Sequence, residues 1–345
     1  MGIFSYSNRA RASQFALLVI SFLVCPLAAG AEQESTHGFP LRNQNPFLQI
    51  FGLPPFQSAT LAADGLANYD LSLDIANHAD AGDNALEDFV IDGESYFFTL
   101  SYRRGVTDNL ELGFDLPLVA HAEGYLDNAI EGWHDLFGMS NTKRRGPSNQ
   151  LEFFYANTGA TQYALNSPSF GVGDIQLTAA IPLRKASDAD DFSVAVRSSL
   201  KLPTGNQDEL RGSGAADFSV GIYASDRTTF WKRDLYLSGF AGALLLGDGD
   251  ILTSIQRSAV PYGGMLATWQ ITENFGITTQ LYAQGQYFDS ELEELGGNSV
   301  QLAIGGDYRL PKRGLSLSFA VVEDVSANAT TDFALHFSIR RIGKR

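Results

Sequence analysis

The sequence contains almost no cysteine: the single one, Cys25, lies inside the apolar stretch Phe15–Leu27. About a dozen apolar residues are too few for a membrane-spanning helix. A basic start, a short apolar core and a small-residue site that ends at Ala31 are instead typical of a secretory signal peptide. We therefore expect residues 1–31 to be removed near Ala31. The remaining chain has no cysteine, which excludes a disulfide framework.

The chain also lacks long hydrophobic runs and positive charge. After Leu27 no apolar run is long enough to form a membrane-spanning helix. The 24 Lys and Arg residues are outnumbered by 39 Asp and Glu residues, which gives a formal net charge of −15. Nucleic acid is therefore excluded as an expected partner, because phosphate binding requires a basic surface. No break in composition suggests a linker, so we expect one large domain rather than two.

What the sequence does contain is alternation of apolar and polar side chains. In Tyr96–Arg103 and again in Leu315–Asp324, every second residue is mostly Leu, Val, Phe or Tyr. The residues between them are mostly polar, and a strand places alternate side chains on opposite faces. The same pattern predicts about twelve strands, at 65–78, 93–105, 109–120, 170–184, 190–203, 215–225, 233–246, 258–271, 274–288, 298–310, 314–325 and 331–341.

The connectors between these strands alternate in length. Short ones are expected at 105–109, 185–190, 271–274 and 310–314, and long ones at 79–92, 121–169, 204–214, 247–257 and 289–297. A soluble β-sandwich does not sort its loops by end, and its second apolar face would be exposed to water. We therefore predict an all-β fold in which residues 64–345 form a transmembrane up-and-down antiparallel β-barrel. Such a barrel belongs in the outer membrane of a Gram-negative bacterium.

Charges also sort by end, with acidic residues in the long connectors and basic residues near the short ones. The acidic loops either form a vestibule that concentrates cations or binds the divalent ions that bridge lipopolysaccharide, or simply keep the loops soluble. Both interpretations place the long loops outside the cell. The expected partners are outer-membrane lipid, lipopolysaccharide and the barrel-assembly machinery, together with a small-molecule solute.

The charged residues on the polar faces of the strands are expected to line the lumen. They are Asp70, Asp74, Glu111, Asp115, Asp174, Arg197, Lys201, Asp217, Asp307, Arg309 and Asp324. As an open pore lining they would favour cations, since acids outnumber bases. Alternatively they pair across a narrow interior, since an unpaired buried charge is costly. The sequence leaves both alternatives open.

The longest connector, 121–169, contains a predicted short helix. Asn128 and Glu131 have the spacing of a capping box, and Ile130, Trp133 and Phe137 form an apolar stripe at helical spacing. We interpret these three residues of the stripe, with His134, as a candidate gate over the barrel mouth; the alternative is a loop that packs on its own rim.

The sequence predicts neither metal nor cofactor, although His134 and the nearby carboxylates Asp127, Glu131 and Asp135 could be considered as metal ligands. A solvated helix face is the commoner arrangement of such residues.

Residues 32–63 follow neither a helical nor a strand pattern, because Pro40, Pro46, Pro54 and Pro55 interrupt them. Several of the intervening residues are Phe, Leu or Ile, so the segment is apolar enough to dock on another surface. We expect it either on the periplasmic side or inside the lumen as a plug.

Catalytic residues are not predicted. Among the five histidines, the closest approach to a serine is His336 beside Ser338 on one strand face. A lone strand histidine is usually a structural hydrogen-bonding group. We therefore do not expect an enzyme, and a membrane-embedded lipid-modifying enzyme is kept only as an alternative.

Several glycine-rich and proline-rich motifs resemble those of known families. They are Pro40–Pro46, Phe51–Pro54, Leu126–Gly138, Gly171–Asp174, Lys201–Gly205 and Gly212–Asp217. In this order they resemble a proteobacterial outer-membrane barrel family known as a domain of unknown function. The last three are also similar to the barrel family linked to the meta-pathway of phenol degradation.

The resemblance implies a barrel in the outer membrane and brings no catalytic residues. The function expected from it is a passive channel or carrier for small solutes, including hydrophobic or aromatic ones. A non-conducting structural or partner-binding barrel is the alternative.

Overall fold

The computed structural model describes residues 38–125, 149–187, 190–325 and 329–342. Its strands are β1 (Ala67–Asp83), β2 (Glu87–Thr107), β3 (Leu110–Ala122), β4 (Glu152–Asn157), β5 (Ala160–Leu165), β6 (Ser169–Val172), β7 (Gln176–Arg184), β8 (Ser193–Lys201), β9 (Asp217–Phe230), β10 (Arg233–Leu245), β11 (Ala259–Gln270), β12 (Phe275–Gln284), β13 (Ser299–Leu310), β14 (Leu315–Asp324) and β15 (Phe333–Ile342). All of them belong to one antiparallel sheet.

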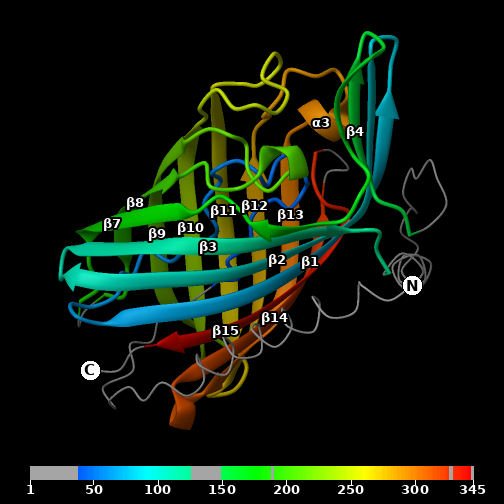
Figure 1. Cartoon of the computed structure of the whole chain (residues 1–345). Helices are drawn as coiled ribbons and strands as arrows, with labels where there is room; N and C mark the ends of the chain where they lie inside the picture. Colours follow the sequence, from blue (N-terminus) through cyan, green and yellow to red (C-terminus); the bar gives the residue numbers. More distant parts are fainter. Residues whose placement is uncertain (1–37, 126–148, 188–189, 326–328, 343–345) are drawn as a thin grey trace, which may run out of the picture.

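The sheet closes on itself as a barrel of 12 strands, as the alternation predicts. β1 pairs with β15 along ten residue pairs, from Asn68↔Ile342 to Asn77↔Phe333. The ring consists of β1, β2, β3 and β7 to β15, while β4 and β5 extend β2 and β6 lies on the end of β3 (Figure 1). Closure leaves the ring without a free edge, which a sheet in lipid requires.

The two faces of each strand differ as the sequence predicts. Along β9, Phe218, Val220 and Ile222 are exposed on the outer face, whereas Ser219 and Tyr223 are buried in the lumen. Outward Leu, Ile, Val and Phe side chains form the apolar belt that lipid would cover. Among the described residues, no helix has the length and apolar character to cross a bilayer.

This arrangement predicts a depth-dependent cost for charge on the outer face. Phe319 lies near the middle of β14 and is 44% exposed, whereas Leu183 lies at the short-turn end of β7 and is 60% exposed. Phe319→Arg is expected to lower the free energy of unfolding in lipid vesicles by about 2–4 kcal/mol, and Leu183→Arg by about 0–1 kcal/mol. Equal costs for the two variants in denaturant titrations would contradict the assigned membrane depth.

Two sequence predictions, one about a connector and one about a strand, are wrong. Residues 79–92 are not a long loop, because β1 and β2 continue pairing as far as Asp83↔Asp88. The Asn84 side chain makes the tight turn by accepting hydrogen bonds from the Leu86 and Glu87 amides, both at 2.8 Å. The resulting hairpin rises above the barrel (Figure 1). The predicted strand 170–184 is also divided, into β6 and β7, where residues 173–175 leave the ladder.

The connector 121–169 is not a plain loop, since it contains β4, β5 and the beginning of β6. The helix predicted around residues 126–138 lies outside the described residues, as do the signal peptide and the gate residues Ile130, Trp133, His134 and Phe137. Among the described residues, a short helix, α3 (Glu293–Gly296), lies in the connector between β12 and β13.

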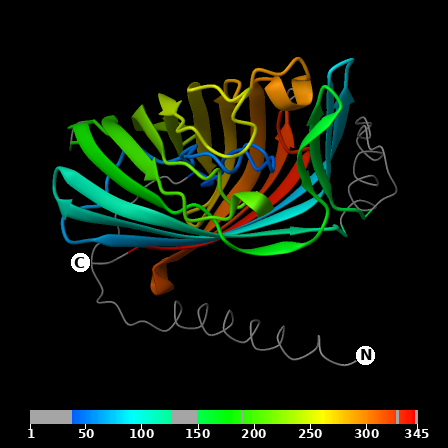
Figure 2. The same cartoon turned by 45° about the horizontal axis from the view of Figure 1, so that its top comes forward.

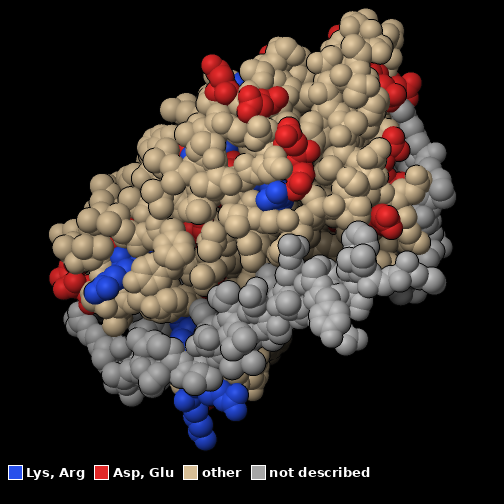
Figure 3. All heavy atoms as spheres, in the orientation of Figure 1, with Lys and Arg blue, Asp and Glu red and all other residues tan. Residues whose placement is uncertain are grey.

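Charge sorts by end on the described surface. Figure 3 shows Asp and Glu gathered mainly over the long-loop end, and the largest group of Lys and Arg at a strand turn on the other side. That turn is the 3₁₀ segment η2 (Pro311–Arg313), whose last turn contains Lys312 and Arg313.

The hydrophobic core of the molecule lies inside the barrel. Residues 38–63, called here the inner segment, run through the lumen and are enclosed by the strands (Figures 1 and 2). Nine of its apolar side chains are at most 4% exposed: Phe39, Leu41, Phe47, Leu48, Ile50, Phe51, Leu53, Phe56 and Ala59.

Candidate functional site

The inner segment begins half-way along the lumen and rises to the loop end. The Phe39 amide donates to the Gln280 side-chain oxygen at 3.0 Å, and the Gln280 Nε2 donates back to the Phe39 carbonyl at 3.0 Å. Farther up, the Asn43 Nδ2 donates to the Ala329 carbonyl at 2.8 Å. The first limb is therefore held by side chains that face the lumen.

At the loop end the inner segment turns beneath the extension of the barrel. The Phe47 ring lies 5.4 Å from the Phe89 ring and 5.5 Å from the Tyr163 ring, measured between centroids. Gln49 donates to the carbonyl of Leu210 in the connector between β8 and β9. The strands β2 and β5 and this connector thus cover the turn of the inner segment.

The second limb returns to the short-turn end along an aromatic part of the wall. The Tyr282 hydroxyl donates to the Pro54 carbonyl at 2.6 Å, and the Phe56 ring lies edge-on to Phe240 at 5.4 Å. Phe240 also stacks on Tyr223 with a centroid distance of 5.1 Å. Aromatic pairs of this kind add to the free energy of burial.

The limb ends with contacts to polar groups of the wall. The Ala59 amide donates to Ser225 Oγ at 2.9 Å, and the Ala62 amide donates to Glu111 Oε2 at 2.6 Å. Arg197 donates through Nε to the Ser58 carbonyl at 2.8 Å. Backbone groups that a non-repetitive segment cannot pair internally are satisfied here by the barrel.

A buried lysine joins the inner segment to the wall near the loop end. The ammonium group of Lys201, whose side chain is 1% exposed, lies 2.8 Å from Asp174 and 3.0 Å from Asp217. It also donates to the Ile50 carbonyl at 2.9 Å and to the Ser213 hydroxyl. Three of the predicted lumen charges, Lys201, Asp174 and Asp217, therefore meet in one cluster, called here the Lys201 cluster.

This cluster brings together four of the glycine-rich and proline-rich motifs. Asp174 accepts hydrogen bonds from the amides of Thr204 at 2.9 Å and Gly205 at 2.7 Å, and Asp217 accepts one from Gly52 at 2.8 Å. Asp174 lies within the break between β6 and β7, which explains why that strand is divided. Several of the motif glycines allow backbone to approach a carboxylate, since a Cβ at Gly212 would clash with Asp174 Oδ1.

Gly52 provides a direct test of this close packing. A Cβ at this position would lie 2.9 Å from the Asp217 Cβ and 3.1 Å from the Lys201 Cβ. Gly52→Ala is therefore expected to lower the free energy of unfolding by about 1–3 kcal/mol. Gly239→Ala is the matched control, because the nearest atom to its new Cβ is an ordinary 3.6 Å away. Equal stability of the two variants in denaturant titrations would contradict the packing.

Three arginine–carboxylate pairs line the lumen at the short-turn end. The distances are 2.7 Å for Arg197–Glu111, 2.8 Å for Arg103–Asp115 and 2.8 Å for Arg340–Asp70. Arg197 on β8 reaches Glu111 on β3 across the intervening strand β7, where the residue between them in the register is the small Ala180.

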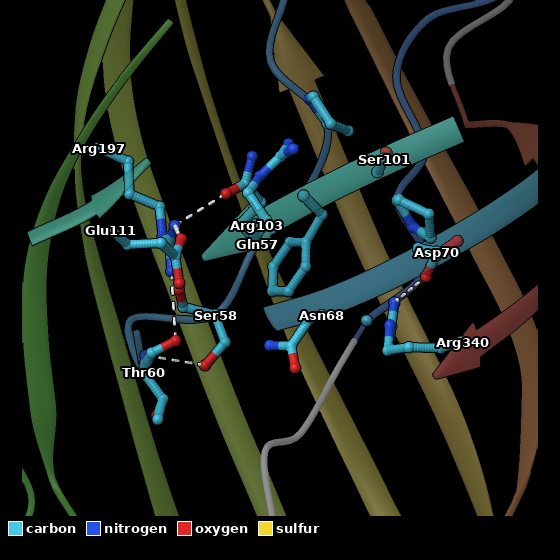
Figure 4. Close-up of a pocket in the computed structure, with 14 residues that line it drawn as sticks. Gln57, Ser58, Thr60, Asn68, Asp70, Ser101, Arg103, Glu111, Arg197 and Arg340 are labelled. Atoms are coloured by element: carbon cyan, nitrogen blue, oxygen red, sulfur yellow. Dashed lines mark hydrogen bonds and ion pairs between the residues drawn. The ribbon is translucent and has the colours of Figure 1, made fainter. Parts of the chain in front are cut away.

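The wall and the inner segment leave a small cavity of about 90 Å³ beside these pairs. Figure 4 shows Arg197, Glu111 and Arg103 on one side of it and the Asp70–Arg340 pair on the other. Gln57, Ser58 and Thr60 of the inner segment complete its lining. Each of the arginines that line the cavity has a carboxylate partner.

The other predicted lumen residues are placed as follows. Asp74 on β1 accepts a hydrogen bond from His336 Nδ1 at 2.6 Å. Asp307 accepts hydrogen bonds from Ser316 and Ser318 of the neighbouring strand, and Arg309 lies 3.8 Å from Asp307. Asp324 is half-buried and pairs in register with the buried Gln301.

One buried polar chain has no counterpart in the sequence analysis. Ser95 Oγ lies 2.9 Å from His78 Nε2 and 2.8 Å from His121 Nδ1, and His121 Nε2 lies 3.3 Å from the Leu210 carbonyl. All three side chains are at most 1% exposed. The residues are on three different strands, and their spacing in the sequence does not predict the contact.

Outside the barrel ring, Glu87 connects the extension of β2 to a neighbouring loop. Burial raises the pKa of its carboxyl, but hydrogen bonds from Ser290, Tyr155, the Glu291 amide and Asn84 outweigh burial and lower it. Burial and the bond to Glu87 raise the pKa of Tyr155 to about 12. Within the described ranges, no group of three or more His, Cys, Asp or Glu side chains is placed to hold a metal ion.

Comparison with solved structures gives the same architecture. The COG4313 outer membrane channel from Pseudomonas putida F1 has a TM-score of 0.53 and 13% sequence identity, covering 84% of this chain and all 100% of that one. The NanC porin has a TM-score of 0.44 and 8% identity, covering 81% of this chain and 99% of that one. At such low identity the first likeness shows the fold alone.

A search of curated proteins gives no significant match. The sequence pattern of one family, in contrast, matches residues 15–341, which is nearly the whole chain. The chain therefore belongs to the family described as "Protein of unknown function (DUF3187)".

Proposed function

We propose that this protein is an outer-membrane channel or carrier for the passive passage of small solutes, and that residues 32–63 are its plug. The observation that carries the proposal is the path of the inner segment through a closed barrel. The segment is hydrogen-bonded to lumen-facing side chains along its length, including Gln280, Ser225 and Glu111. The fold shared with an outer membrane channel supports the same function.

The solutes best suited to this lumen are uncharged and hydrophobic or aromatic. Tyr223, Phe240 and Tyr282 form an aromatic wall that contacts Phe56 and Pro54 of the plug. Each lumen arginine is paired with one carboxylate and Lys201 is paired with two, so the lumen offers little unpaired charge to an ion. A preference for cations, which the excess of acids suggested, is supported less well than a preference for neutral solutes.

The same filled lumen also favours a second candidate, a non-conducting barrel that serves structure or partner binding. In that case the inner segment is a permanent part of the core and never leaves. The two functions differ in one measurable property, which is whether the inner segment moves when the barrel works.

A disulfide lock distinguishes the two. The hydroxyl oxygens of Ser58 on the inner segment and Ser225 on β9 lie 3.3 Å apart, and outside residues 1–31 the sequence has no cysteine. We expect Ser58→Cys/Ser225→Cys to abolish solute flux into proteoliposomes when oxidised and to restore it when reduced. Either single cysteine variant is the control. Equal flux in the oxidised and reduced states would contradict a moving plug.

A further inference from the structure

A slot of the size of one ring lies behind the first phenylalanine of the inner segment. Phe39 is 1% exposed and belongs to a buried cluster separate from the main core. Apart from Phe39, Leu41 and three larger wall residues, that cluster consists of the alanines Ala76, Ala303, Ala320 and Ala334. Because alanine fills little volume, the wall at this height leaves room that the Phe39 ring occupies.

A buried imidazole with an unused nitrogen borders this slot. The rings of His336 and Phe39 are in contact, with centroids 5.7 Å apart and planes inclined by 56°. His336 is fully buried and its Nδ1 lies 2.6 Å from the Asp74 carboxylate, so Nδ1 carries a proton that it donates. Among the described residues Nε2 has no hydrogen-bond partner.

A buried polar atom without a hydrogen-bond partner is costly, so a ligand that pairs with this nitrogen would gain free energy. A second one accompanies it, since the hydroxyl of Ser338, two residues along the same face of β15, also has no partner among the described residues. The barrel thus presents two unused polar groups beside an alanine-lined slot.

The backbone of Phe39 is held by a wall side chain whose two hydrogen bonds can be made to a solute once Phe39 has left. Gln280 pairs with the Phe39 amide and carbonyl at 3.0 Å each, as a neighbouring strand would. When Phe39 leaves the slot, the Gln280 side chain has one free donor and one free acceptor at the mouth of the slot.

We propose that Phe39 occupies a solute-binding subsite, and that this subsite takes a small neutral molecule with one ring and a hydroxyl group. The ring of the solute replaces the Phe39 ring against the alanines. Its hydroxyl pairs with His336 Nε2, donating to a neutral imidazole or accepting from a protonated one. The inference rests on the proposed function, because the solute reaches the slot only when the plug leaves it.

Calorimetric titration of the full-length Phe39→Ala variant in lipid nanodiscs tests the subsite with two probes of equal size. Benzyl alcohol is expected to bind at least about tenfold more tightly than ethylbenzene, because only the alcohol satisfies the buried nitrogen. In Phe39→Ala/His336→Phe the preference for the alcohol should vanish while ethylbenzene binding remains. Phe39→Val, a milder change, should give weaker binding with the same order of preference.

Phe47→Ala is the matched control, since Phe47 is an equally buried ring of the inner segment that contacts Phe89 and Tyr163 instead. It should show no preference for the alcohol. Equal affinities of the two probes for Phe39→Ala, or an unchanged preference without His336, would overturn the proposal. Failure of the proposed function gives a different result. The slot would still bind benzyl alcohol in Phe39→Ala, but Ser58→Cys/Ser225→Cys would show the same solute flux when oxidised and when reduced.

Discussion

Replacing Lys201 with methionine is expected to lower the free energy of unfolding by about 3–5 kcal/mol. The substitution removes the only positive charge of a buried ion cluster and leaves the carboxylates of that cluster buried without a partner of opposite charge. The two carboxylates within 3.0 Å of the ammonium group, those of Asp174 and Asp217, are 5% and 0% exposed. Methionine fills a similar volume, so the loss reports the charge rather than a cavity. The carbonyl of Ile50 would lose its donor at the same time.

Denaturant titrations in lipid vesicles, followed by tryptophan fluorescence, would measure this loss. Lys201→Met/Asp217→Asn should regain part of the stability, since it removes one of the two stranded charges. Arg184→Met is the control, because Arg184 pairs with Asp190 at an exposed turn where a salt bridge contributes about 0–1 kcal/mol. A Lys201→Met barrel as stable as the Arg184→Met barrel would show that the cluster does not hold the inner segment.

Alternation along the chain was sufficient to predict the antiparallel barrel. Arg197, Lys201 and Asp217 were assigned to the polar faces of their strands, and all three are buried in the lumen. This succeeds because the period of a strand is fixed at two residues, so one face determines the other. The connector 79–92 is mispredicted for a different reason: its acidic residues suggest a solvent-exposed loop, yet the backbone keeps pairing.

Contacts between distant strands could not be read from the sequence. Arg197 and Glu111 are 86 residues apart, and their pairing depends on β7 lying between them with Ala180 in register. The Ser95 chain with His78 and His121 likewise depends on which strands are neighbours. The path of the inner segment is harder still, because prolines remove the periodicity from which strands and helices are predicted.

Deletion of the inner segment, residues 38–63, is expected to convert a closed barrel into one that conducts ions. The interior of a 12-strand barrel is wider than that of a filled eight-strand barrel. Without the inner segment the wall presents Ser225, Gln280 and paired charges to the lumen, and water can solvate all of them. Planar bilayers should show discrete current steps for the deletion variant and none for the full chain. A folded deletion variant without current would contradict this expectation and would mean that the wall closes the lumen even without the inner segment.

The ion selectivity of the deletion variant follows from the pairing of its charges. Arg197, Arg103 and Arg340 are each matched by one carboxylate. At the loop end, however, Lys201 faces two carboxylates, which leaves one negative charge in excess there. Reversal potentials in a salt gradient should therefore show a modest preference for cations, and Asp217→Asn in the deletion background should reduce it. Strong cation selectivity, or anion selectivity, would mean that the pairs do not persist once the inner segment is gone.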